Sequence, residues 1–157
     1  MTKYNVTRHV NYSADQIYAI AADVPSYHDF IPLVRLSTVR NWKRHDDGTE
    51  TFDAHLLVTY RKLGIRETFT SKVVADPANR IVTSSGGGGA VKSLVSVWKI
   101  MPSPQGGADI EYAVDFTMNS RSMQFLLSGM FDLAVRKVMG AFEERARMLY
   151  GPPPVAA

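Results

Sequence analysis

The sequence predicts an α+β domain in which one long helix covers one face of a single antiparallel sheet. Segments between Leu33 and Met118 alternate apolar and polar residues with a period of two, which is typical of strands with one covered and one solvated face. The C-terminal segment instead carries apolar residues at helical spacing. The chain of 157 residues is long enough for one domain with a substantial core.

The N-terminal segment predicts one strand followed by two short helices. Apolar residues alternate from Tyr4 to Tyr12, which indicates an opening strand. Ser13 then begins a helix, and Gln16 stands three residues later, as a capping box requires. Pro25 ends this helix because proline pushes the residue before it out of the helical region. A second short helix is expected over residues 26–30.

Turn residues divide the middle of the chain into six further strands. The alternation is clearest over residues 52–60 and 110–118, where apolar residues occupy every second position. With the opening strand these segments give a seven-stranded sheet. The predicted breaks are Asp47-Gly48, Leu63-Gly64, Asp76 to Asn79, Gly86 to Gly89 and Pro102 to Gly107.

A long helix is predicted from Arg121 to Tyr150, and Gly151 with the prolines after it ends the helix. Its apolar side is rich in methionine and phenylalanine, which suit an irregular cavity as well as a plain core. Both interpretations of this side stay open at this point. The predicted stripe comprises Leu127, Met130, Phe131, Ala134, Val138, Phe142 and Leu149.

Composition argues against several classes of function. The chain has no cysteine, and its four histidines are scattered, so neither a disulfide nor a metal site is expected. A net charge of +3 is too small to indicate nucleic acid by itself. The cluster Gly86 to Gly89 lacks the glycine directly before lysine that a phosphate loop needs. No nucleophile motif occurs, so we expect no enzyme, no catalytic residue and no cofactor. No apolar run approaches a membrane span, and a cytoplasmic protein is expected.

Two long stretches of sequence carry a family resemblance, with shorter support between them. They are VNYSADQIYAIAADVPSYHDFIP and IEYAVDFTMNSRSMQFLLSGMFDLAVRKVMGAFEERA, and between them lie LGIRETFTSKV and KSLVSVWKI. The chain resembles the coenzyme Q-binding, START-like proteins of the polyketide cyclase/dehydrase group. The resemblance implies a helix-grip fold (START/Bet v 1-like), with a domain over residues 1–150 and a disordered tail over 151–157.

The same resemblance implies a function. It implies a hydrophobic tunnel between the sheet and the last helix, which binds ubiquinone or a related isoprenoid lipid. The protein would be a carrier or chaperone that supports respiratory electron transport, with ubiquinone as bound ligand rather than cofactor. Because the family includes bacterial ribosome-association toxins, a ribosome-binding role is the alternative, followed by a polyketide cyclase or dehydratase.

The sequence departs from the family pattern near Trp98. Relatives usually have an acidic-Gly-Pro-Phe-type turn where this chain has residues 88–91, Gly-Gly-Ala-Val. They also tend to have glycine two residues before the tryptophan, where this chain has Ser96. A contact that this turn makes with ligand in relatives would therefore be altered here.

The predicted ligand-binding residues come from the resemblance and from the alternation along the strands. Among them, Glu67 shares a strand face with Ile65, Phe69 and Val73, and a buried carboxylate is costly unless it is paired. It is either a polar anchor for a quinone or hydroxyl head, an acid catalyst, or, as we favour, half of a salt bridge with Arg8 or another base. The full set is Tyr27, Phe30, Ile31, Pro32, Leu56, Val58, Glu67, Phe69, Trp98, Tyr112, Val114, Phe116, Leu127, Met130, Phe131, Ala134 and Val138.

Two surface segments have candidate partners. Arg40, Lys43 and Arg44 form a basic cluster that suits ribosomal phosphates or anionic lipid, unless it is a solvated strand end. Residues 122–131 contain no charge, and Tyr27 to Pro32 is a second apolar patch. One hypothesis is that both patches gate the tunnel and touch a membrane transiently; the alternative, which we favour, is ordinary core packing. A monomer, cytoplasmic and peripheral to the inner membrane, is expected.

Overall fold

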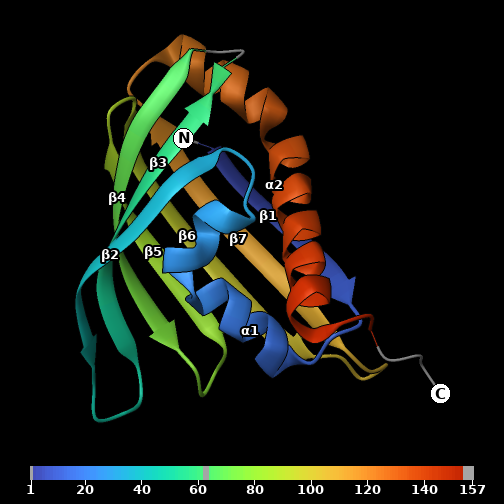
Figure 1. The fold of residues 1–157 in the computed structure, drawn as a ribbon. Coiled ribbons are helices and arrows are strands. Elements are labelled where there is room, and N and C mark those ends of the chain that lie inside the picture. Colours follow the sequence, from blue (N-terminus) through green and yellow to red (C-terminus); the bar gives the residue numbers. More distant parts are fainter. Residues whose placement is uncertain (1, 62–63, 154–157) are drawn as a thin grey trace.

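The computed structural model describes residues 2–61 and 64–153, and it contains one curved antiparallel sheet with three helical segments on its concave side (Figure 1). These helices are α1 (Ala14–Ala22), the 3-10 helix η1 (Val24–Asp29) and α2 (Arg121–Tyr150). The predicted fold class, a seven-stranded helix-grip, is confirmed. The strands are β1 (Thr2–Val10), β2 (Val34–Arg44), β3 (Glu50–Tyr60), β4 (Ile65–Asp76), β5 (Ile81–Gly88), β6 (Val91–Pro102) and β7 (Ala108–Met118).

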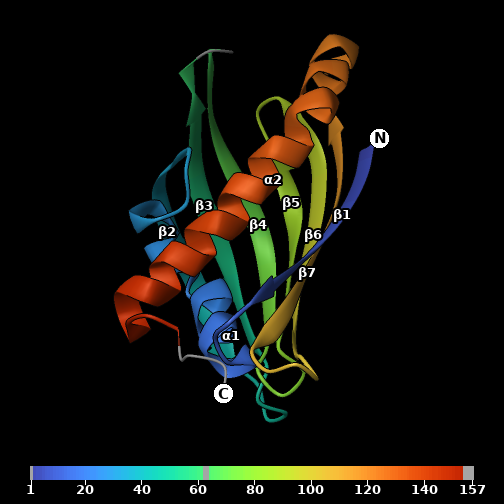
Figure 2. The same cartoon turned by 90° about the vertical axis from the view of Figure 1, so that its right-hand side faces the viewer.

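The strand order is β1-β7-β6-β5-β4-β3-β2, and every neighbouring pair is antiparallel. β1 pairs with the last strand rather than with β2, so the first two strands form opposite edges. The two short helices carry the chain from one edge to the other across the concave side (Figure 1). α2 crosses the sheet obliquely and packs mainly on β1, β7 and α1 (Figure 2).

The helix ends follow the sequence signals. Ser13 and Gln16 form the predicted capping box, with bonds of 3.0 and 3.1 Å between their side chains and each other's backbone N–H. The first helix ends before Pro25, as predicted, but Pro25 also lies in the first turn of η1, where its missing N–H costs nothing. The predicted tail includes Gly151, whose carbonyl accepts a hydrogen bond of 2.8 Å from the Tyr12 hydroxyl. Leu63 and residues 154–157 lie outside the described residues.

The core is concentrated around the second half of α2. Phe142 is fully buried, and its ring stacks on Trp98 at 4.6 Å and meets the Phe30 ring at 5.5 Å. Of the predicted stripe, Leu149 is wrong, because half of its surface is exposed. The buried side of the helix is rotated relative to the prediction, and it comprises Val135, Met139, Phe142 and Ala146.

Candidate functional site

The inner face of β3 and β4 changes along its length. At one end Phe52 and Val73 are opposite each other in the register and are buried. Towards the β3–β4 hairpin the pair Ala54 with Ser71 is still buried, but the two pairs after it, Leu56 with Phe69 and Val58 with Glu67, are only half-buried. Apolar side chains at this second end therefore keep water contacts that the first end has lost. We call this the open end of the sheet.

Two more segments, the start of α2 and the β5–β6 turn, meet at the open end. The Asn119 side chain, directly before α2, donates a hydrogen bond of 2.9 Å to the Gly89 carbonyl, and its backbone N–H donates one to the Ala90 carbonyl. Gly89 in turn lies against the carboxylate of Glu67. The β5–β6 turn thus connects the start of α2 to the inner face of β4.

The first half of α2 covers this region incompletely. Residues 121–134, all of which the structure describes, include no buried side chain. Phe131 makes the ring contacts of this half, stacking on Phe116 at 4.6 Å and meeting Tyr4 edge-on at 5.8 Å. Gln124 fixes the helix start by accepting a bond of 2.6 Å from the Met118 N–H. The inward side chains of this half are Leu127, Met130, Phe131 and Ala134. They are half-buried, as is Val138 in the second half.

Small hydroxyl residues line the middle of the inner face. Ser71 and Ser96 are buried, and Ser84 is opposite Ser96 in the register. Small side chains leave more room above a sheet than the valines and leucines that usually occupy such positions. Alternation alone places Ser84 and Ser96 on the face of Trp98, although neither is among the predicted ligand-binding residues.

Tyr112 adds a donor to this hydroxyl group. Burial raises the pKa of Tyr112 to about 12, while the neighbouring Ser96 side chain acts in the opposite direction. The phenol therefore stays protonated at neutral pH and can donate a hydrogen bond. Trp98 lies beside it, with ring centroids 4.2 Å apart.

Glu67 points to the inner face, and it forms no ion pair or hydrogen bond with any described residue. The predicted partner Arg8 is wrong, because Arg8 lies on β1 across the sheet and its Nη2 binds Oε1 of Glu143 at 2.6 Å. A Cβ on Gly89 would overlap a Glu67 carboxylate oxygen, and Gly89 has a φ of +56°. Only glycine leaves this carboxylate its space, a contact that no local sequence signal reveals.

The predicted gate residues before β2 do not form an exposed patch. Tyr27 and Ile31 are buried, and the Tyr27 hydroxyl donates a short hydrogen bond to the Ala21 carbonyl. The half-buried Phe30 ring packs on Phe142, and the Arg145 guanidinium lies 5.1 Å from the centre of this ring. The prediction that these residues form a second surface patch is therefore wrong. The alternative, ordinary core packing, describes them, because the 3-10 turn directs them at the second half of α2; Pro32 alone is exposed.

The structure divides the predicted ligand-binding residues into groups by burial. The buried group comprises Trp98, Val114, Phe116, Tyr27 and Ile31. The half-buried group comes from three strands, η1–β2 and both halves of α2. It comprises Phe30, Leu56, Val58, Glu67, Phe69, Tyr112, Leu127, Met130, Phe131, Ala134 and Val138.

The predicted basic cluster lies on the edge strand β2 and is exposed. Arg44 forms an ion pair of 3.0 Å with Glu50 and lies 5.9 Å from the centre of the Trp42 ring. Arg40 and Lys43 flank a β-bulge at Asn41, whose φ is +57°. This cluster is remote from the open end, because β2 ends with it at the opposite end of the sheet (Figure 1).

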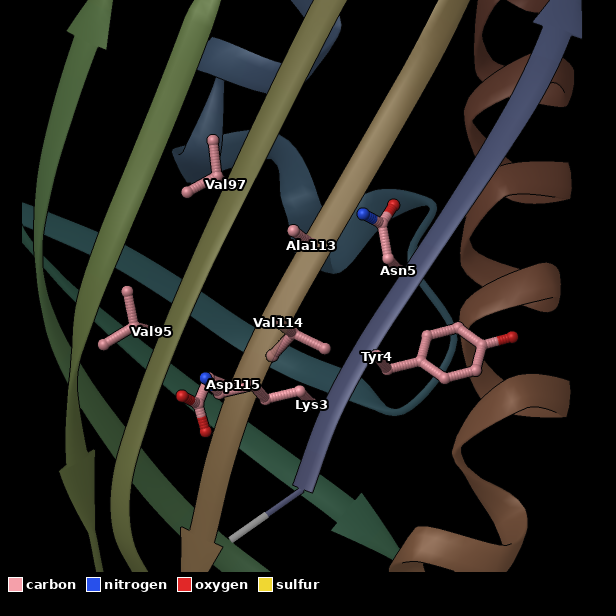
Figure 3. Close-up of a pocket in the computed structure, with 8 residues that line it drawn as sticks. All are labelled: Lys3, Tyr4, Asn5, Val95, Val97, Ala113, Val114 and Asp115. Carbon is pink, nitrogen blue, oxygen red and sulfur yellow. The ribbon is translucent and has the colours of Figure 1, made fainter.

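A shallow hollow of about 380 Å³ lies on the other face of the sheet (Figure 3). Val95, Val97 and Ala113 line it, and they alternate along β6 and β7 with the inward Ser96, Trp98 and Val114. Lys3, Asn5 and Asp115 complete the rim, while the Tyr4 ring points towards α2. This hollow is therefore not the internal tunnel that the resemblance implies.

Comparison with known families agrees with this architecture. The model of the family described as polyketide cyclase / dehydrase and lipid transport matches residues 10–143. The chain belongs to this family.

Relatives within the family have different descriptions. The mitochondrial coenzyme Q-binding protein COQ10 of Drosophila melanogaster is 28% identical over 149 residues, which cover 93% of this chain and 59% of that protein. The chain thus spans less than two thirds of that relative's length. The ribosome association toxin RatA of Escherichia coli is 28% identical over 150 residues, covering 96% of this chain and 90% of the toxin.

Solved structures share the fold. An 18 kDa protein of Caulobacter crescentus is 28% identical with a TM-score of 0.81, covering 97% of this chain and all of that one. The ZhuI aromatase/cyclase of a Streptomyces species has a TM-score of 0.76 at 19% identity, covering 96% and 99% of the two chains. At that identity the enzyme shows a shared fold and nothing more.

Two further observations concern the described part of the chain. None of its helices is both long and apolar enough to cross a membrane. Its histidines, aspartates and glutamates form no group of three or more that could hold a metal ion.

Proposed function

We propose that this protein binds ubiquinone or a similar isoprenoid lipid between the open end of the sheet and the first half of α2. The observation that carries this proposal is a set of half-buried apolar side chains that face inward from both sides, including Leu56, Phe69, Leu127 and Met130. A guest there removes apolar surface from water, at about 25 cal/mol per Å². The COQ10 relatives, described as coenzyme Q-binding, support the same ligand class.

The polar groups of the site suit a ring that carries oxygens. The protonated Tyr112 hydroxyl donates, so it matches a quinone carbonyl. An ionised Glu67 only accepts, so it matches a hydroxyl, as on a reduced quinol. Together they would orient a polar ring while the apolar chain lies along α2. With ubiquinone bound in this way, the proposed role is that of a carrier or chaperone in respiratory electron transport.

The proposed role is binding without chemistry. On the inner face the Ser37 hydroxyl lies 2.7 Å from Nδ1 of His28, but it donates a hydrogen bond of 2.8 Å to the Pro25 carbonyl, and the described residues include no metal-binding group. The unpaired Glu67 is the residue on which a cyclase or dehydratase reaction would depend. An unchanged rate in a Glu67→Gln variant, for any turnover that is detected, would remove that residue from catalysis.

The test begins with the native ligand. Protein purified from its own host is extracted with organic solvent, and the extract is analysed by mass spectrometry for quinones and other lipids. The purified protein is then titrated with a short-chain ubiquinone while tryptophan fluorescence is followed. A Trp42→Phe variant leaves Trp98 as the single reporter, because the chain has two tryptophans. Saturable quenching is expected; absence of extracted lipid together with no quenching would disprove the proposal.

A second function is favoured by the RatA relatives, which match nearly the whole chain. We propose ribosome binding through Arg40, Lys43 and Arg44 as the alternative. Co-sedimentation with ribosomal subunits, weakening as salt rises, is the expected sign. An Arg40→Glu/Lys43→Glu variant should lose it, and wild type that stays in the supernatant at low salt would exclude it.

A further inference from the structure

The outward side of the first half of α2 is apolar. Phe125 is 83% exposed, Leu133 61% and Leu126 42%. Their spacing places them on one side of the helix, with Ser122 and Gly129 between them, and the one charge at their border, Asp132, is paired with Arg136. Three large apolar side chains exposed within nine residues form a patch that a purely structural helix surface does not need. We call Phe125, Leu126 and Leu133 the helix patch.

Basic residues lie at the same end of the molecule as the helix patch. Arg121 begins α2, Arg61 and Arg66 flank the β3–β4 hairpin, and Lys92 follows the β5–β6 turn. All four are exposed, and none forms an ion pair with a described residue. The hydrogen bonds from Asn119 to the 89–90 turn hold the segments of Arg121 and Lys92 together.

Acidic groups at this end are neutralised or turned away. Glu67 faces inward, Asp132 binds Arg136 at 3.0 Å, and Asp115 is opposite Lys3 on the outer face. The opposite end of the sheet is different. There, carboxylates and bases occur together: Asp15 pairs with Arg80 at 2.7 Å, Asp109 pairs with His9 at 2.9 Å, and β2 ends in the basic cluster. The molecule therefore has a basic end, where the helix patch lies, and an opposite end of mixed charge.

We propose that the basic end docks on the surface of an anionic lipid bilayer, with the first turns of α2 lying in the interface. In such docking Phe125, Leu126 and Leu133 enter the boundary between headgroups and acyl chains, while the surrounding cations contact anionic headgroups. A bilayer fits better than nucleic acid, because the centre of the surface is aliphatic and aromatic and its cations lie at the rim. A phosphate backbone instead favours cations along the whole contact.

This surface differs from the membrane contact that the sequence suggests. The uncharged run 122–131 contains both outward residues, such as Phe125, and inward residues, such as Leu127, while Leu133 lies beyond it. Tyr27, Phe30 and Ile31 take no part. The docking surface stands independently of the proposed lipid ligand. It is at the same end as the half-buried inner face, so a bound lipid would have a short path to the bilayer.

The test is flotation of purified protein with quinone-free vesicles of phosphatidylcholine, alone or with added phosphatidylglycerol. Wild type should float with the anionic vesicles and much less with neutral ones or at high salt. A Phe125→Ser/Leu126→Ser/Leu133→Ser variant should lose about tenfold or more in vesicle partitioning. Arg121→Glu/Lys92→Glu should abolish the preference for anionic lipid.

The matched control is Met148→Ser/Leu149→Ser, which removes exposed apolar side chains at the other end of the same helix, 65% and 50% exposed. It should float like wild type. Circular dichroism confirms folding, and a single Phe125→Ser variant replaces the triple one if that unfolds. Wild type that stays unbound with anionic vesicles, or a folded patch variant that floats equally, overturns the proposal. So does binding of this surface to ribosomes instead. Lipid extraction is scored separately, so failure of the ligand proposal does not mimic failure of docking.

Discussion

The two halves of α2 have opposite surfaces although they form one continuous helix. In the second half the inward side chains are buried, with Met139 and Phe142 almost completely enclosed, and the outward side is mainly charged, with Met148 and Leu149 exposed near its end. In the first half no inward side chain is fully buried, and the outward side carries the helix patch. One half therefore contributes mainly to stability. The other exposes apolar surface on both sides, a cost that a binding role would explain.

The largest expected effect tests this division by truncating one residue in each half. Phe142→Ala should lower the free energy of unfolding by about 3–5 kcal/mol, since it removes a fully buried ring that contacts Trp98 and Phe30. Leu127→Ala should cost about 1 kcal/mol, because its side chain is already half-exposed. Urea unfolding followed by circular dichroism measures both. Equal losses would mean that the first half is as well packed as the second.

The next largest expected effect is on stability at alkaline pH, and it concerns Tyr112 on the inner face of β7. Burial raises its folded pKa to about 12, above its ordinary value of about 10. Between these values the unfolded chain loses the phenolic proton while the folded chain keeps it, so stability is full below about pH 10 and falls as pH rises to about 12. In a Tyr112→Phe variant, the loss of unfolding free energy as pH rises from about 10 to about 12 should be smaller by about 2 kcal/mol.

The check is the free energy of unfolding measured at a series of alkaline pH values. Tyr18 and Tyr27 also have raised pKa values, chiefly through burial, so the variant should flatten the profile only in part. Tyr150→Phe is the matched control, because Tyr150 is exposed. A Tyr112→Phe profile that coincides with wild type would show that its hydroxyl is not enclosed.

The sequence was sufficient for the fold because the fold depends on local patterns. Alternation over residues 52–60 and 110–118, the glycine-containing turns and the Ser13 cap each act within a few residues. The number of strands and the long helix follow from these patterns. These patterns do not decide which side of each helix faces inward. Phe125 and Leu127 are both apolar at neighbouring positions, and only packing against Phe116 and β1 decides which of them faces inward.

Site details failed in prediction where they depend on contacts distant in sequence. Glu67 lies against Gly89, and Arg8 pairs with Glu143 from the far end of the chain. The predicted gate residue Tyr27 is buried because η1 turns it towards Phe142, a tertiary contact that composition cannot report. The buried Ser96 was noticed only as a departure from the family, although its strand face could have placed it in the site.

A smaller effect tests the contact that joins the β5–β6 turn to the open end. Gly89→Ala should cost about 2 kcal/mol, because its positive φ strains a side chain and its Cβ would displace the Glu67 carboxylate. In a Glu67→Ala background the same substitution should cost about 1 kcal/mol, the backbone part alone. Denaturant unfolding of the four proteins in this double-mutant cycle measures the difference. Additive costs would show that the carboxylate does not occupy this space.

The substitution with the smallest effect on stability most directly separates the two sides of the first half of α2. Ala134→Phe places a ring on the half-buried inward side, and Leu133→Phe changes the neighbouring, outward position. Neither disturbs the packed half, so each should alter the free energy of unfolding by less than about 1 kcal/mol. If a lipid lies between α2 and the open end, Ala134→Phe should reduce co-purified lipid about tenfold, since a loss of about 1.4 kcal/mol in affinity is a tenfold change. Leu133→Phe should leave lipid content unchanged and should keep or strengthen vesicle binding. The opposite result, with lipid lost only on the outward substitution, would place the ligand on the helix patch and would reject an internal site.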